Sequence, residues 1–138
     1  MKVLSSLILL CALALLTAGC ATRSSVKPPA RAALEVREGL ASYYGQSFHG
    51  KLTASGALFD MNELVAAHPS YPFHTIVRVT NLRNARSVQV RILDRGPSQH
   101  ARADGVVIDL SYGAARALGF VEDGRTRVRL EVLRWGKK

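Results

Sequence analysis

Polar and apolar residues alternate along four stretches in the second half of the chain. These stretches are Thr75–Leu82, Ser87–Leu93, Val106–Leu110 and Thr126–Leu133. A period of two sends successive side chains to opposite faces of a strand, so each stretch predicts a half-buried β-strand. The short polar segment Arg83–Arg86 between the first two predicts a hairpin.

Shorter patterns predict the remaining elements of the fold. Leu40–Tyr44 predicts a first strand, and Asn62–Ala67 predicts one turn of helix. A second helix is predicted over Tyr112–Leu118, because the Ser111 hydroxyl can cap its start and Gly119 can end it. Strands that surround few and short helices indicate a small β-barrel with long loops.

The first twenty residues have the pattern of a targeting signal. Met1–Lys2 is a short basic start, Val3–Leu16 is an apolar run, and Thr17–Cys20 supplies small residues that end in a cysteine. This order is typical of a secretory signal. The ending resembles a bacterial lipobox, in which signal peptidase II cuts before a cysteine that becomes lipid-modified. Ordinary secretion without a lipid is the alternative.

We therefore expect residues 1–19 to be a lipoprotein signal peptide and Cys20 to be the lipidated first residue of the mature chain. Ala21 follows rather than aspartate, and the sorting rule of Gram-negative lipoproteins then predicts the outer membrane, facing the periplasm. Residues 20–38 are polar, with paired serines and prolines, and predict a flexible tether. Residues 39–134 are enough for one compact domain.

Charge and cysteine content narrow the chemistry. The formal net charge is +9, which fits attraction to anionic cell-wall polymers or phospholipid headgroups. A periplasmic location argues against nucleic acid as a partner.

The cysteines and histidines predict neither a disulfide nor a metal site. Cys11 is removed with the signal peptide, so no disulfide is expected in the mature chain. The four histidines match no common ligand spacing, and we expect neither a metal site nor a cofactor.

One acidic residue stands where a strand is predicted to end. Asp94 closes the alternating stretch Ser87–Leu93 and is followed by Arg95, a glycine and a proline, which predict a turn. Loops of this kind often carry catalytic or binding side chains on a rigid scaffold. The alternative is that Asp94 only stabilises the turn, as aspartates often do.

An ordered series of short motifs resembles the rare lipoprotein A (RlpA-like) family over nearly all of Gly39–Leu133. The matching motifs are Gly39–Gly45, Phe48–Gly56, Phe59–Asn62, Ala66–His68, Val77–Leu82, Asp94–Pro97 and Ile108–Ser111. The resemblance implies a mainly β fold, a six-stranded double-psi β-barrel with one or two short helices, which is shared with expansins. It also implies endolytic cleavage of peptidoglycan glycan strands, giving 1,6-anhydro-N-acetylmuramic acid ends.

The resemblance further implies partners. Peptidoglycan glycan strands are the expected substrate, the outer membrane holds the lipid anchor, and cell-division or cell-wall proteins are possible partners. Many family members carry a C-terminal SPOR domain that recognises peptide-free glycan. This chain stops at Lys138, so we expect it to lack that module.

The family pattern assigns roles to individual residues. Asp94 matches the catalytic aspartate, which protonates the glycosidic oxygen and then takes the proton of the muramoyl 6-hydroxyl. One carboxyl group can serve both steps, whereas hydrolytic glycosidases usually need two. His68 falls on a residue associated with activity, with a structural role as the alternative. Asp109 is expected to serve the barrel, by bonding loop amides or the following helix.

The remaining site predictions concern substrate binding. Tyr44 and Phe48 are expected to stack against sugar rings, and Thr53 belongs to the Thr-Ala-Ser-Gly motif of the site. Arg95 is expected to contact the glycan, with a plain salt bridge as the alternative.

One position departs from the family pattern. Family members commonly carry a catalytic glutamate directly after the Thr-Ala-Ser-Gly motif, where this chain has Ala57. Glu63 follows six residues later. The segment Ser98–Gly105 is longer than the family pattern, and Ser98 replaces a common phenylalanine. A second function is therefore open, namely a non-catalytic peptidoglycan-binding or divisome-associated lipoprotein that resembles expansins.

Overall fold

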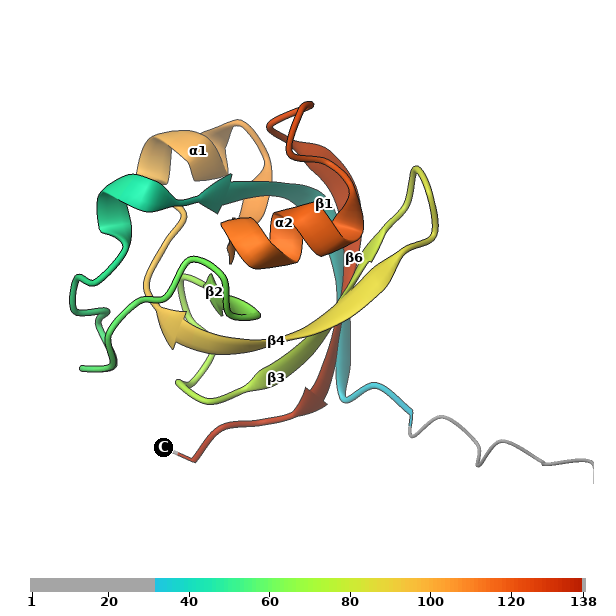
Figure 1. Cartoon of the computed structure of the whole chain (residues 1–138). Coiled ribbons are helices and arrows are strands. Elements are labelled where there is room, and N and C mark those ends of the chain that lie inside the picture. The colour runs from blue at the N-terminus through green and yellow to red at the C-terminus, as the bar shows by residue number, and fades with distance from the viewer. Residues whose placement is uncertain (1–31, 138) are drawn as a thin grey trace, which may run out of the picture. The chain divides into compact units, whose positions relative to one another are not determined.

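The computed structural model describes residues 32–137. The expected signal peptide and Cys20 lie outside this range. Six strands close into a barrel (Figure 1). In order around the barrel they are β1 (Glu35–Tyr44), β5 (Val106–Ser111), β2 (Val65–Ala67), β4 (Ser87–Asp94), β3 (Ile76–Asn81) and β6 (Thr126–Arg134). The predicted strands and the hairpin between β3 and β4 are confirmed.

The strand directions identify the type of barrel. β1 runs parallel to β5, and β2 runs parallel to β4, while all other neighbouring strands are antiparallel. Parallel neighbours cannot be joined by a tight hairpin and need a longer connection that crosses the barrel. Two such pairs in a closed six-stranded barrel confirm the expected double-psi fold.

Helices occupy the connections. η1 (Gln46–Phe48) is a single turn of 3₁₀-helix, α1 spans Gln99–Ala103, and α2 spans Tyr112–Leu118. The predicted caps of α2 are confirmed, because Ser111 Oγ accepts a hydrogen bond from the Ala114 N–H (3.3 Å) and Gly119 adopts a left-handed φ of 73°. α1 is a helix where a long loop was expected.

The core follows the alternating pattern of the strands. Inward-facing side chains of β3, β4, β5 and β6 are at most 1% exposed, namely Val77, Val79, Val90, Ile92, Ile108, Leu110, Val128, Leu130 and Val132. Burying an aliphatic side chain of this kind contributes about 1.5–3 kcal/mol. The residues that alternate with them face outward and can make polar contacts on the outer face of the barrel.

Two boundaries differ from the sequence prediction. The helical turn predicted over Asn62–Ala67 is wrong, because Val65–Ala67 pair with β4 on one side and with β5 on the other. The barrel also begins before Gly39, since Glu35 already pairs with Val132 of β6. Residues 35–38, assigned to the tether, therefore belong to β1. Their side chains are largely exposed on the strand, which explains their tether-like composition.

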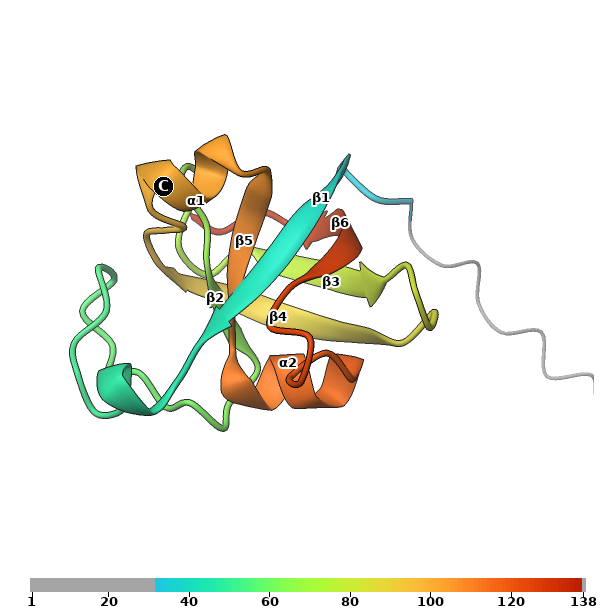
Figure 2. The same ribbon diagram turned by 90° about the horizontal axis from the view of Figure 1, so that it is seen from above.

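The segment between η1 and β2 projects from the barrel, as both Figure 1 and Figure 2 show. An isolated bridge between Leu52 and Leu58 and a hydrogen bond from Gly50 N–H to the Phe59 carbonyl (2.8 Å) hold it together. None of the helices within residues 32–137 has the length and hydrophobicity of a membrane span.

Candidate active site

An aspartate flanks each side of the short strand β2. Ala67, its last residue, pairs with Asp94 of β4 and with Asp109 of β5. Neighbouring strands are spaced about 4.8 Å apart, so the two aspartate Cα atoms lie about 10 Å apart. A register shift between Ala66 and Ala67 places Asp94, rather than Leu93, beside Ala67. Both aspartates line one cavity of about 530 Å³.

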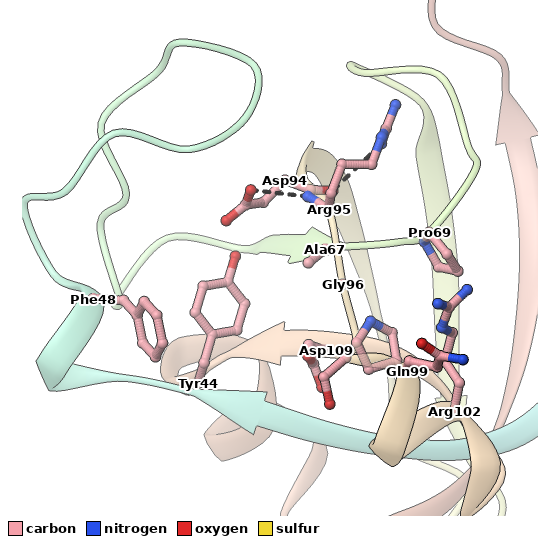
Figure 3. Close-up of a pocket in the computed structure, with 12 residues that line it drawn as sticks. Tyr44, Phe48, Ala67, Pro69, Asp94, Arg95, Gly96, Gln99, Arg102 and Asp109 are labelled. Atoms are coloured by element: carbon pink, nitrogen blue, oxygen red, sulfur yellow. Dashed lines mark hydrogen bonds between the residues drawn. The ribbon is translucent and has the colours of Figure 1, made fainter.

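The cavity has an aromatic end and a polar end. Figure 3 shows Tyr44 and Phe48 at one end, and Gln99 and Arg102 of α1 at the other, with Asp109 between them. Pro69 completes the polar end. Aromatic faces together with a few polar groups are typical of sites that bind small organic ligands.

Asp94 is held by two backbone donors. Its Oδ1 accepts hydrogen bonds from the N–H groups of Ala54 (2.9 Å) and Arg95 (2.8 Å). β4 ends at this residue, so the predicted position at the end of a strand is confirmed. Because both donors bind Oδ1, the orientation of the carboxylate is fixed within the cavity. Its catalytic role stays a prediction.

Thr53 supports the site from behind. Its side chain is buried and does not line the cavity. The Thr53 hydroxyl donates to the Ala57 carbonyl (2.9 Å) and lies 2.9 Å from the Ser55 hydroxyl oxygen. These hydrogen bonds stabilise the turn that contains Ala54, the residue after Thr53. The Ala54 N–H donates to Asp94 Oδ1. Thr53 therefore does not contact a substrate in the cavity, and it acts on Asp94 through the turn.

Asp109 was expected to serve the barrel, but its side chain lines the cavity. Burial raises the pKa of this carboxyl, while a hydrogen bond from the Ser42 hydroxyl and the positive charge of Arg125 oppose the rise. A Cβ atom on Gly96 would lie 3.3 Å from Asp109 Oδ2, so the turn after Asp94 passes directly beside it. The alternation of Val106–Leu110 is the sequence signal that turns Asp109 away from the core.

Tyr44 brings an unsatisfied hydroxyl to the cavity. Its ring stacks on Phe59 (centroids 4.3 Å apart) and meets the edge of Phe48 (5.5 Å). Within the described residues the buried hydroxyl has no hydrogen-bond partner. Burial raises its pKa, and the negative charges of Asp94 and Asp109 raise it further. The phenol is therefore neutral and keeps its proton.

His68 lies behind the cavity wall and does not line the cavity. The side chain is 1% exposed and stacks on Tyr71 with 3.5 Å between ring centroids. His68 Nδ1 accepts hydrogen bonds from the N–H groups of Ser70 (3.2 Å) and Tyr71 (3.0 Å), which leaves the proton of the neutral ring on Nε2. Burial, followed by the charges of Arg37 and Arg95, lowers its pKa to about 4.

Arg95 lines the cavity, but its guanidinium is engaged elsewhere. Nη1 donates to the carbonyls of His68 (3.3 Å) and Tyr71 (3.0 Å), and the group lies 3.9 Å from the centre of the Phe73 ring. In Figure 3 it points away from the Asp94 carboxylate. Arg102 is the exposed cation at the polar end, and the cap formed by Ser98 Oγ with the Ala101 N–H (3.3 Å) is the signal for its helix.

The described residues contain no cluster of side chains suited to binding a metal ion. Across residues 32–137, no three histidine, cysteine, aspartate or glutamate side chains gather closely enough to hold a metal ion. The chemistry that the cavity offers comes from two carboxyl groups, one phenol and the donors of α1.

Solved structures confirm the fold at low sequence identity. A Streptomyces papain inhibitor superposes with a TM-score of 0.59 at 22% identity, covering 74% of this chain and 97% of the inhibitor. The Clavibacter michiganensis expansin, solved as a mutant with cellohexaose, gives a TM-score of 0.57 at 18% identity, covering 75% of this chain and 53% of the expansin.

Sequence relatives are closer. The probable endolytic peptidoglycan transglycosylase RlpA of Synechocystis is 52% identical over 98 residues, covering 71% of this chain and 29% of the relative. The endolytic peptidoglycan transglycosylase RlpA of Campylobacter jejuni is 47% identical over 102 residues, covering 74% and 36%. The chain thus spans about a third of the length of these relatives. A family described as "Lytic transglycolase" matches residues 36–130. The chain belongs to this RlpA-like, double-psi β-barrel family of lytic transglycosylases.

Proposed function

We propose that this protein is an endolytic peptidoglycan transglycosylase that cleaves glycan strands and leaves 1,6-anhydro-N-acetylmuramic acid ends. The observation that carries the proposal is the pair Asp94 and Asp109, which face one cavity from either side of Ala67. The names of the Synechocystis and Campylobacter relatives support the same reaction.

The two carboxyl groups divide the proton transfers. Burial raises the pKa of Asp109 and so favours its protonated form, which donates the proton to the glycosidic oxygen as the bond to the anomeric carbon breaks. The muramoyl 6-hydroxyl then bonds to that carbon, and the Asp94 carboxylate takes the hydroxyl proton. No water is consumed, and the bond electrons of the glycosidic linkage leave with its oxygen. Where an inverting glycosidase leaves room for a water between its two carboxyl groups, this site accommodates the substrate's own hydroxyl.

The rest of the cavity orients the glycan. Tyr44 and Phe48 offer apolar surface to the carbon-bound hydrogens of a sugar ring. Gln99 and Arg102 supply donors for hydroxyl or acetamide oxygens at the polar end. Arg95 acts indirectly, by fixing the loop that carries Pro69.

Ala57 supports a second function. Ala57 packs against the apolar cluster of Phe59, Val65 and Leu93, and as an alanine it supplies no carboxylate. If the missing family glutamate is essential, the protein binds peptidoglycan without cleaving it. The resemblance of its fold to an expansin fits this alternative.

The test compares the full chain with carboxamide variants. Purified sacculi are incubated with wild type, Asp94→Asn, Asp109→Asn and the control Asp123→Asn, and anhydro-muropeptides are measured by mass spectrometry. Asp123 pairs with Arg83 outside the cavity and is 48% exposed. We expect product from wild type and the control, and a loss of roughly 10²-fold or more in the other two. Sacculus binding should persist in all four. Background release by all four forms would instead establish the binding function.

We further propose that Cys20 anchors the protein to the outer membrane on its periplasmic face, where wall and division proteins are available as partners. The cysteine at the end of the lipobox and the net charge of +9 support this address. A diacylglycerol and an amide-linked acyl chain together exceed what stable membrane attachment needs. Cys20→Ser should therefore release the protein from the outer-membrane fraction or leave it unprocessed. Unchanged fractionation would contradict the anchor.

A further inference from the structure

A second cavity of about 530 Å³ lies where the first and last strands of the barrel meet the β2–β3 loop. Glu35 and Arg37 of β1 line it, together with Ser70 and Tyr71 of the loop and Trp135 directly after β6. None of these residues lines the cavity of Asp94 and Asp109. The reaction described above therefore leaves this cavity without a role.

Trp135 forms an exposed and firmly held aromatic surface. Its side chain is 38% exposed, and it meets Tyr71 edge to face at 5.2 Å, a contact that covers at most one face of the indole. The next residue, Gly136, donates its N–H to Thr75 Oγ1 (3.0 Å). A Cβ atom on Gly136 would overlap the Phe73 carbonyl, so the chain packs tightly against the loop at this point. The backbone that follows Trp135 is thus held against the loop.

Polar groups of both charges surround the indole. The Tyr71 hydroxyl donates to Glu35 Oε1 (2.7 Å), and the Arg37 Nη2 atom lies 3.6 Å from the same oxygen. The Arg37 side chain is 54% exposed, so its guanidinium is accessible to a ligand as a hydrogen-bond donor. A flat apolar surface beside donors and acceptors suits a pyranose ring, whose faces are apolar and whose rim carries hydroxyls.

The two cavities share one rigid wall. Pro69 lines the cavity of Asp94, and its neighbour Ser70 lines the cavity of Trp135. Arg95 Nη1 binds the carbonyls of His68 and Tyr71 on either side of this pair. A polymer that crosses the loop at Pro69 and Ser70 reaches both cavities. A second contact of this kind raises the affinity for a long strand far more than for a short fragment.

We propose that the cavity around Trp135 is a saccharide-binding subsite that holds a further segment of the glycan strand lying in the Asp94 cavity. The identity of the saccharide as peptidoglycan glycan rests on the proposed function. Trp135 supplies the stacking surface, and Arg37 and Glu35 bind ring hydroxyls. The subsite selects long strands, which is the substrate property that an endolytic enzyme requires.

The chain contains a single tryptophan, so its fluorescence reports on this cavity alone. The full chain carrying Asp109→Asn, which blocks cleavage, is titrated with peptide-free glycan strands released from sacculi by an amidase. We expect a saturable change in tryptophan emission. In calorimetric titrations, Trp135→Ala should bind these strands roughly tenfold more weakly. Leu82→Ala, with the same 38% exposure, is the matched control and should bind normally. Arg37→Gln should weaken binding in the same direction as Trp135→Ala.

The outcomes separate this inference from the proposed function. Glycan binding with unchanged emission, and with normal affinity in Trp135→Ala, would overturn the subsite and leave the transglycosylase intact. A saturable emission change in Asp109→Asn, together with no anhydro products from the wild type on sacculi, would support the subsite and overturn the enzyme. Emission that responds to phosphatidylglycerol vesicles and not to glycan strands would show a lipid contact instead, which also overturns the saccharide subsite.

Discussion

Asp94 and Asp109 lie in one row across the barrel wall, because each pairs with Ala67 from opposite sides of β2. The two carboxyl groups have different surroundings. Both are half-buried, but Asp94 Oδ1 accepts two backbone N–H groups, whereas Asp109 accepts a hydrogen bond from the Ser42 hydroxyl. Burial raises the pKa of Asp109, which favours the protonated form that an acid role needs.

The first prediction concerns the pH dependence of cleavage. Asp109 must be protonated to act as the acid, so the rate should fall as the pH rises through its raised pKa. The Ser42 hydrogen bond opposes that rise in pKa. Ser42→Ala should therefore move the alkaline limb of the rate profile to higher pH. The measurement is kcat/KM for anhydro-product release across the pH range, for wild type and variant.

Ser87→Ala is the control for this experiment. Ser87 is exposed at the start of β4, at the opposite end of the strand from Asp94. Its substitution should leave the profile unchanged. An alkaline limb that moves to lower pH in Ser42→Ala would rule out Asp109 as the acid.

The second prediction concerns stability in acid. The fold holds His68 neutral, with a pKa of about 4 against an ordinary value of 6.5. A lowered pKa means that the unfolded chain binds the proton more readily than the folded chain does. The folded state therefore has its full stability above pH 6.5 and loses stability as the pH falls toward 4. The loss corresponds to about 3 kcal/mol of unfolding free energy. Urea unfolding measured from pH 7 to pH 4 tests it.

His68→Asn provides the comparison. Its side-chain oxygen can accept the N–H groups of Ser70 and Tyr71 that His68 Nδ1 accepts, but it does not titrate. The variant should be less stable at pH 7, because the stacking on Tyr71 is lost. It should also lose less stability than wild type on acidification. Equal losses in both proteins would show that His68 does not titrate with folding.

The extended strands could be predicted because their pattern is local. In β3 and β6 every second residue is buried, and a period of two is visible without knowledge of the neighbouring strands. α2 could also be predicted, since Ser111 and Gly119 mark its two ends. The hairpin between β3 and β4 needed only the short polar connection.

The strand β2 and the cavity could not be predicted in this way. β2 has three residues, all buried, so it shows no alternation, and its strand conformation depends on pairing with β4 and β5. The position of Asp109 across β2 from Asp94 follows from the same pairing. The cavity at Trp135 joins the two ends of the barrel sequence, a proximity that no local pattern encodes.

The third prediction concerns the support of Asp94 by Thr53. Thr53→Val removes the hydroxyl that bonds the Ala57 carbonyl and so loosens the turn that presents the Ala54 N–H to Asp94. We expect kcat to fall while KM changes little, because Thr53 does not line the cavity. The unfolding free energy should fall by about 0.5–1.5 kcal/mol. Thr53→Ser keeps the hydroxyl and should restore kcat. A rise in KM alone would indicate instead that Thr53 binds substrate.

The last prediction uses the departure at Ala57. Ala57 packs against the apolar cluster that contains Leu93, the neighbour of Asp94, and it occupies the position of the family glutamate. If the family glutamate assists proton transfer, Ala57→Glu should raise the rate of anhydro-product release, and roughly 10²-fold is the scale of such assistance. Ala57→Gln has the same length without the charge and should show no gain. Equal rates in Ala57→Glu and Ala57→Gln would mean that Asp94 and Asp109 suffice for the chemistry. A gain confined to Ala57→Glu would mean that this chain works with a weakened version of the family's site.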